Sequence, residues 1–106
     1  MITDDDAERA ADWLRDNSGD AAKARAERLY MEEFRKSLKA IIMSEHIDES
    51  GIAQERFAYS DERYIIHLDA MKTAIEVDEK CRFLRESALA KLDAWRTFAA
   101  DRRGKI

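Results

Sequence analysis

The stretch that decides the fold runs from Ser60 to Arg103 and reads SDERYIIHLDAMKTAIEVDEKCRFLRESALAKLDAWRTFAADRR. It contains neither glycine nor proline, the two residues that are least favourable inside a helix. Ser60 is a good N-cap, and Gly104 follows the stretch as a stop signal. The sequence therefore predicts one helix of roughly 65 Å, at about 1.5 Å per residue.

The composition of the remaining residues also favours helix. The 106-residue chain has no proline, three glycines and a single valine, against 17 alanines. This usage predicts an all-α fold, and the length predicts one domain covering residues 1–106. We expect helices over about residues 4–16, 21–48, 52–58 and 60–103. The first begins at Thr3 with Asp6, which can form a capping box, and is ended by Asn17-Ser18-Gly19, where Gly19 suits a left-handed C-terminal position. The sequence Asp48-Glu-Ser-Gly51 breaks the chain before the third.

The helices over 21–48 and 60–103 are predicted to form a long antiparallel hairpin, joined to a short N-terminal helix. The apolar stripe of the last helix shifts near residues 78–82, which predicts a kink or a change of packing partner there. The new partner is expected to be the first helix, with Trp13 and Leu14 covering the end that holds Leu92, Trp95 and Phe98. Charge supports this pairing, because residues 1–20 carry a net charge of −5 and residues 80–106 carry +5.

The second helix is apolar on two nearly opposite sides, so one neighbour cannot cover it. Two or three such helices also form a thin bundle, which predicts a homodimer that completes a four-helix-like core. We expect nine residues to form the helix-packing or dimer core: Phe34, Leu38, Ile41, Leu68, Met71, Ile75, Leu84, Leu92 and Trp95.

Basic and aromatic residues alternate in the C-terminal segment, which could follow a phosphate backbone while an aromatic ring stacks on a base. The residues expected to contact nucleic acid are Arg82, Arg85, Arg96, Arg102 and Arg103, and Lys105 adds to the basic segment. The alternative is that Trp95 is a core residue and that the basic side chains face the acidic first helix. The net charge of −4 and the pI of about 5.2 favour this alternative.

Enzymatic and metal chemistry find no support in the sequence. His46 and His67 are preceded three residues earlier by Met43 and Tyr64, so the Glu-x-x-His pairs of di-iron bundles are absent. Cys81 is most simply a small residue on an apolar helix face. We expect no catalytic residues, no metal and no cofactor. The short apolar runs and the acidic N-terminus predict neither a membrane span nor a signal peptide, and the lone cysteine fits a reducing cytoplasm.

Four segments resemble small all-helical phage and prophage proteins of proteobacteria. They are AERAADWLRD at 7–16, KARAERLYMEEFRKSLK at 23–39, AQERFAYS at 53–60 and LDAWRT at 92–97. Such proteins are mostly uncharacterised, and some are encoded near phage recombination and replication genes. The resemblance implies an accessory role in phage DNA metabolism, in the cytoplasm of the host cell, and it carries over no catalytic residue.

We therefore expect a non-catalytic accessory or adaptor protein of phage or prophage origin, a homodimer with an unidentified protein partner. It would support DNA recombination or replication through protein–protein contacts. The first alternative is a structural or morphogenetic component that assembles with itself. The second is direct DNA binding through the basic C-terminal helix, which the overall charge makes the less favoured reading.

Overall fold

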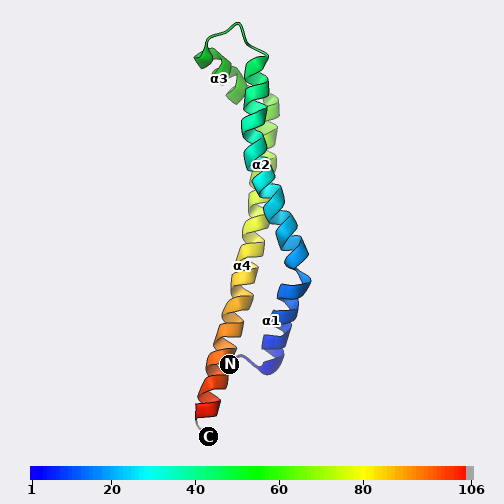
Figure 1. Ribbon diagram of the computed structural model, residues 1–106, viewed down its shortest axis with the longest axis vertical. Coiled ribbons are helices and arrows are strands. Elements are labelled where there is room, and N and C mark those ends of the chain that lie inside the picture. Colours follow the sequence, from blue (N-terminus) through cyan, green and yellow to red (C-terminus); the bar gives the residue numbers. More distant parts are fainter. Residues whose placement is uncertain (105–106) are drawn as a thin grey trace. The chain divides into compact units, whose positions relative to one another are not determined.

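The structure is a computed structural model, and it describes residues 1–104. Four helices follow one another, α1 (Asp4–Asp16), α2 (Ser18–Ser44), α3 (Gly51–Ser60) and α4 (Glu62–Gly104), and the described residues contain no strand (Figure 1). The all-α fold is therefore confirmed. The predicted C-terminal helix is also present, because α4 runs for 43 residues without interruption. Lys105 lies outside the described residues.

The start of α1 forms as its sequence predicts. The Thr3 hydroxyl accepts a hydrogen bond from the Asp6 backbone N–H at 3.1 Å, and the Asp6 carboxylate accepts one from the Thr3 backbone N–H at 3.0 Å. This capping box satisfies two N–H groups at the helix N-terminus. The Thr3 backbone N–H and then the Arg9 guanidinium lower the pKa of Asp6 from 3.8 to about 2.

The start of α2 and the conformation of Gly19 differ from the prediction. Gly19 was expected to end the first helix in a left-handed conformation, yet it lies inside α2, and no described glycine has a positive φ. Asn17, the first residue of the expected stop signal, separates the two helices, and its side-chain amide donates to the carbonyl of Trp13 at 2.9 Å. α2 consequently begins at Ser18 rather than at residue 21. It ends at Ser44 rather than at residue 48, because residues 45–48 form turns.

The N-cap of α4 also differs from the prediction. Ser60 is the last residue of α3, and its hydroxyl donates to the carbonyl of Arg56 at 2.7 Å. The residue before α4 is Asp61, whose carboxylate accepts the backbone N–H of Arg63 at 2.8 Å. Asp61 is therefore the N-cap of α4, because its side chain accepts a hydrogen bond from a backbone N–H of the first turn.

Packing within the chain divides into two compact units. We call residues 24–78 the hairpin unit, and Met1–Lys23 together with the chain from Glu79 onward the terminal unit. The division between Asp78 and Glu79 falls where the sequence predicts that α4 changes its packing partner. Each unit is described by itself below.

In the hairpin unit, α2 and the first half of α4 pack antiparallel (Figure 1). The Arg28 guanidinium contacts the Asp78 carboxylate at 2.9 Å, and the Met31 carbonyl lies 2.7 Å from Nε2 of His67. Further along α2, Glu45 pairs with Arg63. These three contacts show that the two helices run in opposite directions.

The core of the hairpin unit lies where α2, α3 and α4 meet. Its buried residues are Leu38, Ile42, Ala58 and Tyr64, and Phe34, Met43 and Leu68 pack against them. α3 contributes Ala58 to this core and is held to α2 by Tyr59, whose hydroxyl accepts from Nζ of Lys39 at 2.8 Å. This contact places α3 on the Lys39 side of the hairpin.

In the terminal unit, α1 packs antiparallel to the second half of α4. Asp4 contacts Trp95, whereas Trp13 lies beside Leu84 at the other end of α1. This corrects the expected register, in which Trp13 covered the region of Trp95. Net charge favours the pairing of these two segments, but it does not specify which of their turns meet.

Buried positions in both units are mostly alanine. Six of the nine buried apolar residues among those described are alanines, and the three larger ones are Leu38, Ile42 and Tyr64. Alanine lets helix backbones approach closely, but it removes little apolar area from water. Most of the large apolar side chains therefore lie at or near the surface.

Candidate functional site

The nine residues predicted to form a packing or dimer core differ widely in exposure. Leu38 is buried, whereas Ile41 and Leu84 are exposed. The other six are half-buried: Phe34, Leu68, Met71, Ile75, Leu92 and Trp95. The exposed members are not covered within the chain, so they are available to a second molecule.

One side of the hairpin unit carries a cluster of apolar residues, four of them exposed and Phe34 half-buried, which we call the hairpin flank: Tyr30, Phe34 and Ile41 of α2 with Ile66 and Val77 of α4. Tyr30 and Phe34 stack with ring centroids 5.9 Å apart, and Phe34 contacts the His67 ring at 5.5 Å. Tyr30 is 65% exposed, Ile41 49% and Ile66 58%. These exposed fractions are large for apolar side chains, which are usually buried.

Helix geometry places these residues on one side. At about 100° per residue, Tyr30 and Ile41 lie roughly 90° round α2 from its buried stripe, and Ile66 and Val77 lie roughly 110° round α4 in the same rotational sense. In an antiparallel pair, displacement in the same sense brings residues to the same flank. α3 lies on the opposite flank, where Lys39 contacts Glu55 at 3.4 Å. The hairpin flank is therefore left uncovered.

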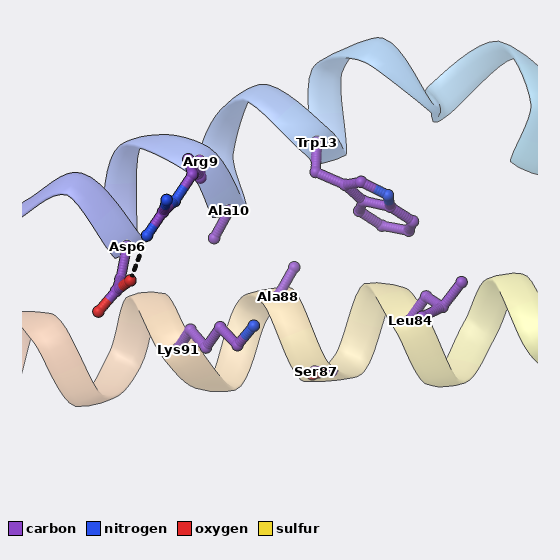
Figure 2. A pocket seen from close by; sticks show the side chains of 8 residues that line it. All are labelled: Asp6, Arg9, Ala10, Trp13, Leu84, Ser87, Ala88 and Lys91. Carbon is purple, nitrogen blue, oxygen red and sulfur yellow. Dashed lines mark hydrogen bonds and ion pairs between the residues drawn. The ribbon is translucent and has the colours of Figure 1, made fainter. Parts of the chain in front are cut away.

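The terminal unit contains a groove of about 400 Å³ between α1 and α4 (Figure 2). Its lining residues are Asp6, Arg9, Ala10, Trp13, Leu84, Ser87, Ala88 and Lys91. Figure 2 shows the Trp13 ring lying between the helices near Leu84, with Ala10 and Ala88 facing each other beside it. At the other end, Arg9 pairs with Asp6 at 2.7 Å, and Lys91 extends along α4. One end of the groove is apolar and the other is charged.

The five arginines predicted to contact nucleic acid fall into two groups. Arg82 and Arg85 lie near the middle of α4, where Arg82 pairs with Glu79 at 2.6 Å and with Glu86 at 3.2 Å. The hydrogen bond that the Arg82 guanidinium donates to the Glu79 carboxylate raises the pKa of Arg82, which keeps it charged. These carboxylates already occupy Arg82, and Arg85 is half-buried, so this group is poorly placed for phosphate contacts.

The second group, Arg96, Arg102 and Arg103, lines a surface hollow of about 750 Å³ near the end of α4, together with Trp95, Ala99 and Ala100. Arg96 pairs with Asp93 at 2.9 Å. The indole N–H of Trp95 donates to a carboxylate oxygen of Asp4 at 2.7 Å, and Arg102 lies 3.7 Å from the same oxygen. The acidic α1 thus meets the basic end of α4, as the charge pattern predicts.

Asp4 is the residue of this region that the sequence analysis did not single out. The net charges of the two segments favoured their pairing but could not select one carboxylate among the seven acidic residues of positions 1–20. The signal that could have found it is its position in the first turn of α1, which the capping box at Thr3 fixes.

The histidines and the cysteine lie apart from one another. His67 bonds the Met31 carbonyl, and His46 stacks on the Phe57 ring with centroids 3.9 Å apart. Cys81 is a half-exposed free thiol on α4. Across residues 1–104, no group of three or more His, Cys, Asp or Glu side chains could hold a metal ion. Within the same range, no helix has the length and apolar character that crossing a membrane requires.

Comparison of the chain with protein-family models, with curated proteins and with solved structures finds no match in any of the three.

Proposed function

We propose that this protein is a non-catalytic helical accessory protein that acts through protein–protein contacts as a homodimer. The resemblance to phage and prophage proteins suggests that the process it supports is DNA recombination or replication. The observation that carries the proposal is the imbalance between buried and exposed apolar side chains. Only three large apolar residues are buried among those described, whereas fifteen are exposed.

The accessible surface supports association with a second molecule. The chain exposes 7922 Å². A folded monomer of 12.3 kDa is expected to expose about 6,100 Å², so the excess is about 1,800 Å². A standard protein interface buries about 800 Å² on each partner, and obligate dimers bury more. The excess therefore matches the area that one subunit of a stable dimer removes from water.

The hairpin flank is the surface that best fits a second copy. Two hairpins that pack through Tyr30, Phe34, Ile41, Ile66 and Val77 place four helices round a shared apolar core, and a twofold axis makes the contact self-complementary. The four large residues of the flank other than Phe34 are exposed in the single chain. Their burial between two subunits would give the dimer a core of large apolar side chains, which the mostly alanine core of the single chain lacks.

Sedimentation equilibrium of two neighbouring variants tests this arrangement. Ile66→Lys places a charge in the hairpin flank, whereas Ile65→Lys makes the same change on a side of α4 that faces away from it, at a residue of similar exposure (48%). We expect a wild-type dimer, a dimer for Ile65→Lys and a monomer for Ile66→Lys.

A wild-type monomer at every concentration would refute the dimer. Equal behaviour of the two lysine variants would refute the assignment to the hairpin flank. Growth of the wild type beyond a dimer would instead favour the self-assembling structural component. The genes on either side of the coding sequence test the phage context independently.

A further inference from the structure

Two hydrogen-bond donors on α4, the side chains of Trp95 and Arg102, form a site that binds the carboxylate of Asp4, and we call this site the seat. Trp95 and Arg102 are seven residues apart, so they lie on one face of the helix two turns from each other. The indole N–H and the guanidinium converge on the same oxygen of Asp4, at 2.7 and 3.7 Å. Both groups are donors with no acceptor capacity, so the seat takes an anion.

The surroundings of this seat carry further positive charge. Arg96 and Arg103 line the same hollow of about 750 Å³. Arg96 is paired with Asp93. No ion pair of Arg103 is found within residues 1–104, where its side chain is exposed. The three arginines of the hollow therefore carry more positive charge than their partners Asp4 and Asp93 neutralise.

Two features of the hollow favour a nucleic-acid strand over an acidic peptide. All of its cations are arginines, whose planar fork matches a phosphate and also stacks on bases. It also contains Trp95, and indole stacking on bases is a main source of affinity for single strands. Ala99 and Ala100 leave the surface beside the indole open.

We propose that the end of α4 binds single-stranded nucleic acid through Trp95, Arg102 and Arg103, and that Asp4 competes with the strand by occupying the phosphate seat. A base stacks on the Trp95 ring, and a phosphate takes the place of the Asp4 carboxylate at Arg102. The acidic α1 acts as a built-in competitor, which reconciles a basic binding face with a chain of net charge −4. This inference is independent of the proposed dimer.

The competition between Asp4 and the strand is tested by removing the charge of Asp4 and, as a control, that of its neighbour Asp5. Asp4→Asn and Asp5→Asn remove the same charge from the same helix turn, but only Asp4 contacts Trp95 and Arg102. Binding is measured by fluorescence anisotropy of a labelled oligothymidine of about 20 nucleotides, at about 50 mM salt. We expect Asp4→Asn to tighten the Kd about fivefold relative to Asp5→Asn, the upper range for a surface ion pair.

Three further variants, made in the Asp4→Asn background, identify the contacts. Arg102→Gln should weaken binding and reduce the slope of log K against log salt by about 0.7, the value for one phosphate contact on a single strand. Trp95→Phe keeps a stacking surface and should retain binding, whereas Trp95→Ala should weaken it at least about fivefold. Circular dichroism of each variant confirms that the helices remain.

The inference is overturned if Asp4→Asn shows no binding at low salt. It is also overturned if Asp4→Asn and Asp5→Asn tighten binding equally, because that outcome reflects overall charge alone. Competition by polyglutamate as effective as competition by unlabelled oligothymidine would assign the seat to an acidic protein partner instead.

Discussion

Ile42 is the only large side chain in the described chain that is fully buried, and its replacement by alanine should cause a large loss of stability. The change removes three carbon atoms, worth about 2.4 kcal/mol at about 0.8 kcal/mol each. The cavity left among Leu38, Ala58 and Tyr64 adds to this cost. We expect the free energy of unfolding to fall by about 3 to 4 kcal/mol, within the usual range for such substitutions.

Ile41 provides a matched control, because it is the same residue type at the next position of the same helix and is 49% exposed. Ile41→Ala should cost about 1 kcal/mol in a monomer, since about half of its surface already contacts water. If Ile41 lies in a dimer interface, this cost increases with protein concentration, because association stabilises only the folded state.

Urea unfolding of the wild type, Ile42→Ala and Ile41→Ala, followed by far-UV circular dichroism at a low and a high protein concentration, measures both effects. The Ile42→Ala loss should be large at the low concentration. Equal losses for the two variants at the low concentration would refute the packing of α2 described above, because the helix would then bury Ile41 as deeply as Ile42.

The remaining predictions concern local contacts. The depressed pKa of Asp6 means that its carboxylate stabilises the folded state fully above the unfolded pKa of 3.8, and this stabilisation is lost as the pH falls through about 2. Helix content followed by circular dichroism should therefore fall on acidification more in the wild type than in Asp6→Asn, and identical acid transitions would contradict the capping box with Thr3. Asp78→Asn should cost about 1 to 2 kcal/mol in urea unfolding, since the Asp78 side chain is only 13% exposed and its ion pair with Arg28 links α2 to α4, whereas the pair of Arg28 with Glu32 lies within α2. No loss there would show that the pair contributes nothing. Ser50→Ala should cost about 1 kcal/mol by the same assay, because the hydroxyl caps α3; Ser50→Thr, which keeps the hydroxyl, should restore most of it.

The helices could be predicted from sequence because their signals are local. α1 begins and ends where predicted, since the capping box of Thr3 and Asp6 specifies its first turn. The errors also have local causes. Gly19 was expected to adopt the left-handed conformation that ends a helix, but glycine inside a helix costs only about 1 kcal/mol relative to alanine, and the boundary falls at Asn17 alone.

The candidate surfaces were harder to predict because they depend on register between distant residues. The charge pattern favours α1 against the end of α4, yet it gives no information on which turns meet. The contact of Asp4 with Trp95 and the position of Trp13 near Leu84 follow from the structure alone. Exposure of Ile41 likewise depends on the rotation of α2, which a broad apolar face leaves open.

The division of the chain into two units has a practical consequence for spectroscopy. Both tryptophans, Trp13 and Trp95, belong to the terminal unit, and all three tyrosines, Tyr30, Tyr59 and Tyr64, belong to the hairpin unit. Tryptophan fluorescence, excited selectively, therefore reports on the terminal unit of the unlabelled protein. Tyrosine absorbance reports mainly on the hairpin unit. A single denaturation series recorded with both chromophores can assign an unfolding transition to its part of the chain without any engineered probe.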